Sequence, residues 1–111
     1  MRMYIATPIN ARPEKTLAEK KRAARHRVNL LKEIIREDGR FGDYDELVST
    51  FDISTIGSRT TEEQAVGMCV TAVLESDAVY LDHGWNASRG CNIEYRAARI
   101  YGKRVFEHDK M

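Results

Sequence analysis

The residues best equipped for chemistry lie in the segment Asp82–Glu94, which joins an apolar run to a predicted helix. In helical projection at about 100° per residue, Glu94 falls at the edge of the stripe expected to face a sheet. The stripe consists of Ile93, Ala97 and Ile100. A carboxylate in that position loses hydration, and its pKa rises unless hydrogen-bond donors compensate. Glu94 is therefore a candidate acid, base or nucleophile; the alternative is a flank glutamate that reaches water or an arginine.

The residues just before Glu94 have the properties of a ligand-binding turn. Ser88 is a good N-cap residue for the predicted helix. Gly90 lacks a side chain, so backbone N–H groups at this helix start can approach an anionic or hydroxyl-rich ligand. Trp85 offers a flat surface for a base or a sugar face. Each feature also has an ordinary structural explanation as a helix cap, a turn or a core residue.

Apolar runs alternate with amphipathic segments along the whole chain. The predicted strands are Met3–Ala6, Leu47–Phe51, Ala78–Leu81 and Arg104–Phe106, and the predicted helices are Pro13–Asp38, Thr60 or Thr61 to Glu75, and Ser88–Tyr101. This alternation predicts one α/β domain over residues 1–111: a flavodoxin-like or Rossmann-like parallel sheet of about four strands with helices on both faces.

Ligands of such sheets bind outside the carboxyl ends of the strands. This rule assigns the site to three loops, Thr7–Arg12, Phe51–Thr61 and Asp82–Arg89. Thr7, Ile9 and Arg12 are therefore predicted substrate-binding residues.

The predicted second helix is apolar nearly all round, with Ala65 and Met68 on one side and Val66 and Val70 on another. A chain of 111 residues has little with which to cover two apolar faces. We therefore expect a homo-oligomer, a dimer or larger, with this helix at the subunit interface.

Composition excludes several classes of protein. The formal net charge is +1, which gives no reason to expect nucleic acid or a membrane as the partner. No apolar run has the length of a membrane span, and the N-terminus lacks a signal-peptide pattern, so we expect a cytoplasmic protein. Cys69 and Cys91 are interpreted as reduced thiols. The three histidines show no ligand spacing, so neither a metal nor another cofactor is predicted.

Four motifs resemble the nucleoside 2-deoxyribosyltransferase-like proteins, above all their small DUF4406 branch. They are the opening Tyr4–Ile9, the run Ser76–Leu81 before Gly84-Trp85, the spacing Ser88-x-Gly90-x-x-x-Glu94, and Ala97-Ala98 before Tyr101-Gly102-Lys103. Their order and spacing cover nearly the whole chain.

The resemblance implies a substrate and a mechanism. The matching glutamate of the family attacks the anomeric carbon of a deoxynucleoside and displaces the base, as a retaining glycosidase does, so Glu94 would be the nucleophile. Tyr4 matches a tyrosine that orients this carboxylate, and Ser88 and Gly90 match positions near the sugar 5′ end. The implied partner is a small-molecule nucleoside or nucleotide.

Three positions leave the activity open. Asp82, at the carboxyl end of its strand, is placed to act on the leaving base, and Arg12 roughly matches a phosphate-binding arginine of related hydrolases. At the position of Cys69 the characterised enzymes carry an acidic residue, and a thiol cannot replace the two acceptor oxygens of a carboxylate. The alternative function is therefore a non-catalytic nucleotide-binding or sensing module with the same fold.

Overall fold

The computed structural model describes residues 1–9 and 16–111. Within these ranges the strands are β1 (Arg2–Ala6), β2 (Glu46–Ser49), β3 (Ala78–Leu81) and β4 (Arg104–Glu107), and the α-helices are α1 (Leu17–Glu37), α2 (Glu62–Leu74) and α3 (Arg89–Ile100). The strands form one parallel sheet in the order β2-β1-β3-β4. The predicted α/β fold with a four-stranded parallel sheet is confirmed.

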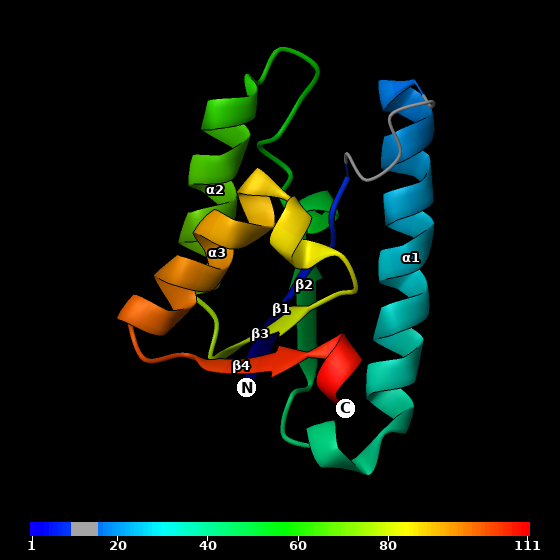
Figure 1. Ribbon diagram of the computed structural model, residues 1–111, viewed down its shortest axis with the longest axis vertical. Coiled ribbons are helices and arrows are strands. Elements are labelled where there is room, and N and C mark those ends of the chain that lie inside the picture. Colours follow the sequence, from blue (N-terminus) through cyan, green and yellow to red (C-terminus); the bar gives the residue numbers. More distant parts are fainter. Residues whose placement is uncertain (10–15) are drawn as a thin grey trace.

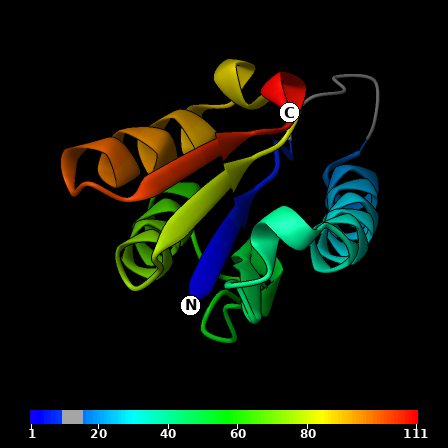
Figure 2. The same ribbon diagram turned by 90° about the horizontal axis from the view of Figure 1, so that it is seen from below.

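Helices cover both faces of the sheet (Figures 1 and 2). α1 lies on one face, and α2 and α3 lie together on the other. The chain moves from β1 outward to β2 and then crosses back to β3 on the other side of β1. The strand order therefore reverses between β1 and β3, where open α/β sheets bind their ligands.

The side chains of β1 alternate between two apolar cores, as the period of a strand requires. Met3 and Ile5 belong to the core under α1, whereas Tyr4 and Ala6 belong to the core under α2 and α3. Tyr4 is 1% exposed and lies on the face of the sheet that α3 covers. The strand register thus directs Tyr4 towards the side of the sheet that carries Glu94.

Hydrogen-bonded caps determine where several elements begin and end. α1 begins at Leu17 because Thr16 and Glu19 form a capping box, while the predicted start at Pro13 lies outside the described residues. β2 ends at Ser49 rather than at Phe51, because a capping box of Ser49 and Asp52 starts a 3-10 turn there. Of the two predicted starts of α2, the structure uses Thr61, whose hydroxyl accepts a hydrogen bond from the Gln64 N–H.

The inner face of α3 differs from the predicted stripe. Its buried residues are Cys91, Glu94 and Ala98, whereas Ile93 and Ile100 are 45% and 77% exposed. Small side chains on this face allow the helix to approach the sheet and α2 closely, and larger ones would overpack the contact. Glu94 consequently lies in the middle of the buried face and not at its edge.

The second helix buries only part of its apolar surface within the chain. Cys69 and Val73 are buried, and Leu74 is 37% exposed. The expected subunit interface on α2 stays a prediction. In residues 1–9 and 16–111, no helix combines the length and apolarity needed to cross a membrane.

Candidate functional site

A pocket of about 140 Å³ opens where β1 ends and α2 and α3 meet, and we call it the Glu94 pocket. Of the predicted site residues, its wall brings together Glu94, Tyr4, Thr7, Ile9, Ser88 and Gly90. Most of the remaining wall is apolar or weakly polar, and half of it comes from α2, including Val66 and Cys69. The strand and helix register thus collects residues that are far apart in the sequence.

Glu94 is the buried carboxylate of this pocket. It is 6% exposed, and its Oε2 atom has no hydrogen-bond partner within the described residues. Burial raises the pKa of Glu94 to about 7, and interaction with the Tyr4 hydroxyl partly offsets that rise. Both protonation states are therefore populated near neutral pH, so Glu94 can act as a nucleophile or as an acid.

Tyr4 and the thiols of the pocket stay uncharged. Burial, followed by the nearby charge of Glu94, raises the pKa of Tyr4 well above its usual value. Burial also raises the pKa of Cys69, whose Sγ donates a hydrogen bond to Thr50 Oγ1 at 3.3 Å, and brings the pKa of Cys91 to about 12. Tyr4 can therefore donate a hydrogen bond to a carboxylate or a substrate, and neither thiol is activated as a nucleophile.

The start of α3 gives the pocket an open edge. The Ser88 hydroxyl accepts a hydrogen bond from the Cys91 N–H at 3.2 Å and so caps the helix, as predicted. A Cβ at position 90 would lie 3.9 Å from Glu94 Oε1, so Gly90 keeps the approach to the carboxylate clear. Ser88, Arg89 and Gly90 also line a hollow of about 240 Å³, the Ser88 hollow.

Two predicted site residues lie outside the Glu94 pocket, and a third is not described. Trp85 packs on Tyr95 with ring centroids 4.8 Å apart and donates its Nε1–H to Glu107 at 3.3 Å, so it is not part of the pocket wall. Asp82 lines a separate cavity of about 770 Å³, which we call the Arg27 cavity. Arg12 lies outside the described residues.

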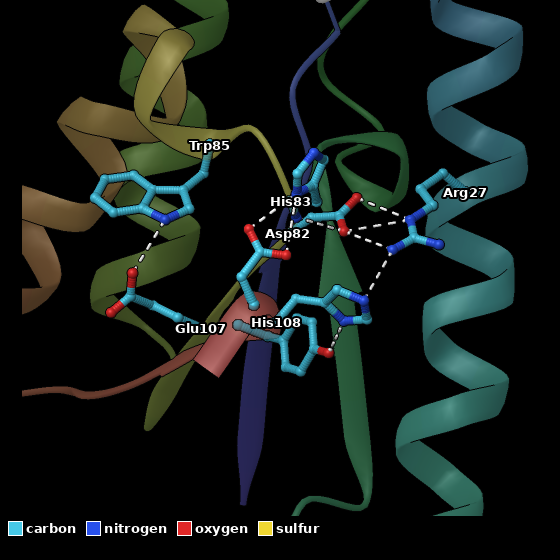
Figure 3. A network of polar contacts seen from close by, with 8 residues as sticks. Arg27, Asp82, His83, Trp85, Glu107 and His108 are labelled. Carbon is cyan, nitrogen blue, oxygen red and sulfur yellow. Dashed lines mark hydrogen bonds and ion pairs between the residues drawn. The ribbon is translucent and has the colours of Figure 1, made fainter. Parts of the chain in front are cut away.

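A polar network surrounds Asp82 (Figure 3). Arg27 Nε donates to both carboxylate oxygens, at 3.2 and 3.1 Å, and Arg27 Nη2 donates to Oδ1 at 2.9 Å. Arg27 Nη2 also lies 3.3 Å from His108 Nε2, and His108 Nδ1 lies 2.6 Å from the Tyr80 hydroxyl. The network connects α1 to the end of β3 and to the turn His108–Lys110.

Sequence reasoning missed several residues of the site. Arg27 was not among the predicted site residues, although it stands three residues after the buried Ala24 and four before the buried Leu31. This spacing places it at the border of the buried stripe, a signal that was available in the sequence. Glu62, which pairs with Arg89 at 3.3 Å, lies at the rim of the Glu94 pocket and gave no comparable signal.

The described part of the chain offers no cluster for a metal ion. Within residues 1–9 and 16–111, no three histidine, cysteine, aspartate or glutamate side chains lie together as possible ligands. The Glu94 carboxylate and the Tyr4 phenol are the buried titratable oxygen groups in the described wall of the Glu94 pocket.

A family model described as a domain of unknown function, DUF4406, matches residues 1–107. The match begins before β1 and ends with β4, so it spans the whole sheet. The comparison with curated proteins gave no significant match, and neither did the comparison with solved structures.

Proposed function

The chain belongs to the DUF4406 family, and we propose that it is an N-glycosidic enzyme with Glu94 as the nucleophile. The reaction is that of a deoxyribosyltransferase or of a deoxynucleoside or deoxynucleotide N-glycosidase. One observation carries the proposal: Glu94 is buried in a pocket with an oxygen that has no partner among the described residues. A buried carboxylate without full compensation costs stability, and such groups concentrate at functional sites.

The size of the Glu94 pocket supports a sugar ring as the group that reacts. A cavity of about 150 Å³ in another protein holds one benzene molecule. The volume of about 140 Å³ therefore suits a single pentose ring and excludes a complete nucleoside. The rest of the substrate must extend out of the pocket.

The proposed chemistry needs only groups that the pocket contains. A Glu94 carboxylate oxygen attacks the anomeric carbon, the C–N bond breaks, and its electron pair leaves with the base. The Tyr4 hydroxyl, which interacts with the same carboxylate, holds it in position. Water or a second base then attacks the glycosyl ester and releases Glu94. Ser88 and Gly90 lie beside the sugar, next to the Ser88 hollow, in keeping with the 5′ end that the resemblance assigns to them.

Release of free base tests the proposal. The protein is incubated with deoxynucleosides and their 5′-monophosphates, and free base is separated by chromatography. We expect release by the wild type and loss of release in Glu94→Gln, whereas Glu33→Gln, an exposed glutamate of α1, keeps it. Adding a second base then separates transfer from hydrolysis. Absence of base from every substrate, or equal release by Glu94→Gln, contradicts the proposal.

Cys69 favours a second candidate, a nucleotide-binding or sensing module without turnover. The thiol is neutral, is buried and donates to Thr50. It therefore cannot offer a sugar the two acceptor oxygens that a carboxylate at this position would supply. This candidate predicts that a nucleotide raises the melting temperature of both the wild type and Glu94→Gln, with no base released.

A further inference from the structure

We propose that Arg27, and not Asp82, contacts the leaving base, and that the base carries carbonyl oxygens. The inference rests on the proposed function, because it assigns the Arg27 cavity to the leaving group of that reaction. It is an alternative to the expectation that Asp82 acts on the base.

The first step is that the Glu94 pocket shares wall residues with two neighbouring hollows. Thr7 and Ile9 line both the Glu94 pocket and the Arg27 cavity. Ser88 and Gly90 line both the Glu94 pocket and the Ser88 hollow. The two hollows are therefore neighbours of the Glu94 pocket, and a substrate with its ring in that pocket would extend past one of these shared walls. The cavity of about 770 Å³ lies in the range of pockets for whole organic ligands, so it is the space that fits a nucleobase.

The second step is that Asp82 is buried and is already bound by Arg27 and by the His83 N–H. Oδ1 accepts from Arg27 Nη2 at 2.9 Å and from the His83 N–H at 2.7 Å, and Oδ2 accepts from Arg27 Nε at 3.1 Å. The aspartate is 3% exposed. A base that used Asp82 as its acceptor would have to reach a buried carboxylate that already forms a charge-assisted pair.

The third step is the polar character that remains in the cavity wall. Besides Asp82, the described wall of the Arg27 cavity contains the carboxylate of Asp109, which pairs with His83 Nδ1 at 2.9 Å. Lys20 also lines the cavity, and Arg27 Nη1 makes no hydrogen bond within the described part of the chain. Among the described residues of the wall both carboxylates are therefore paired while an Arg27 N–H group remains, which suits a ligand with acceptor oxygens.

Arg27 is held in place for this role. Asp82 fixes one edge of the guanidinium, and His108, itself bound to the Tyr80 hydroxyl at 2.6 Å, lies against Nη2 (Figure 3). The hydrogen bonds with Asp82 also raise the pKa of Arg27, so the group stays cationic. A fixed cation where negative charge develops stabilises a transition state without reorganisation.

The chemistry balances with groups already named. As the bond from Glu94 to the anomeric carbon forms, the C–N electron pair moves into the base and is delocalised onto its carbonyl oxygen. Arg27 donates hydrogen bonds to that oxygen, and the released base takes its proton from water. A base without a carbonyl group cannot use this interaction.

The experiment compares Arg27→Lys with the control Lys32→Gln. Lysine keeps a cation beside the buried Asp82, so the fold is retained, while the planar donor is lost. Lys32 lies on the same helix, pairs with Asp52 at 2.9 Å and is outside the Arg27 cavity. The substrates are deoxyuridine, whose base is a poor leaving group without stabilisation of its negative charge, and a 4-nitrophenyl deoxyriboside, whose leaving group is stable as an anion. Binding of free uracil, adenine and inorganic phosphate is measured by calorimetry.

We expect Arg27→Lys to lower kcat/KM for deoxyuridine by about 10²-fold, the usual effect of removing one transition-state donor, and to leave the activated substrate unchanged. Wild type should bind uracil better than adenine, and Arg27→Lys should lose that preference, whereas Lys32→Gln should match the wild type. Equal losses on both substrates, no loss on either, or loss of phosphate binding alone would overturn the inference.

Failure of the proposed function is recognised separately. If the wild type releases no leaving group from any substrate, the proposed function fails. Calorimetry alone then decides whether Arg27 contacts the base. Weaker uracil binding by Arg27→Lys than by the wild type supports this contact. Equal uracil binding by the wild type and Arg27→Lys, or no uracil binding, rejects it.

Discussion

Replacing Glu94 with glutamine should stabilise the folded protein, and the gain should grow as the pH rises. The reason is the burial that raises the pKa of Glu94 from its ordinary 4.5 to about 7. Between these pH values the unfolded chain releases the Glu94 proton while the folded protein still holds it. The free energy of unfolding of the wild type therefore falls as the pH increases through this window. Glutamine has no proton to release and avoids the loss.

The expected magnitude follows from the two pKa values. At about 1.4 kcal/mol for each pKa unit, a rise from 4.5 to about 7 corresponds to about 3 kcal/mol once Glu94 is ionised in both states. At pH 8 this penalty is nearly complete, whereas at pH 5 it amounts to less than about 1 kcal/mol. The stability difference between Glu94→Gln and the wild type should therefore increase by about 2–3 kcal/mol between pH 5 and pH 8.

Urea unfolding at the two pH values measures this difference. Trp85 is the single tryptophan and provides the fluorescence signal. Comparing the pH dependence cancels any constant effect of the amide, since that effect is present at both pH values. Glu33→Gln on α1 is the matched control, because the Glu33 side chain is exposed. Its stability difference from the wild type should be the same at pH 5 and pH 8. A difference that is equal at pH 5 and pH 8, or one that decreases, would refute the electrostatic reasoning.

Three further predictions concern the walls of the site. Gly90→Ala places a Cβ in ordinary contact, 3.9 Å from Glu94 Oε1. The melting temperature should therefore stay the same or rise, with a gain in the free energy of unfolding of up to about 1 kcal/mol. The KM for a nucleoside should increase, because the new methyl group lies at the approach to Glu94. A lowered melting temperature would contradict the space seen at Gly90. Trp85→Ala removes the packing on Tyr95 and should cost about 2–3 kcal/mol in urea unfolding without changing KM, because Trp85 does not line the Glu94 pocket. Cys91, with a pKa of about 12, should resist iodoacetamide at pH 8 in the folded protein and react after unfolding, as mass spectrometry can show.

The architecture could be predicted because its signals are local. Alternation of apolar strands with amphipathic helices indicates a parallel α/β sheet, and the position of ligand sites in such sheets led to Thr7. Ser88 and Gly90 were predicted from the helix start that they form. All three line the Glu94 pocket. Element boundaries were less accurate where a cap decides them, as at Ser49, whose box with Asp52 ends β2 early. Caps depend on a few hydrogen bonds, which apolar periodicity does not register.

The face of α3 shows why periodicity is insufficient for a site. Periodicity identifies residues that share a side of a helix, and by hydrophobicity the sheet should receive Ile93 and Ile100. The structure instead buries the smaller Cys91 and Ala98, together with Glu94. At this contact the helix packs closely against a sheet and a neighbouring helix, so the size of a side chain decides whether it fits, more than its hydrophobicity does.

The sequence by itself determined the order of the elements, the parallel sheet and the strand end at which Tyr4 and Glu94 meet. Only the tertiary structure decided that Glu94 lies in the middle of a buried helix face, that Trp85 packs outside the pocket, and that Asp82 is bound by Arg27, 55 residues away in the chain. The physical reason is distance along the chain. Propensity and periodicity act over a few residues, whereas burial and ion pairing depend on which distant segments the fold brings into contact.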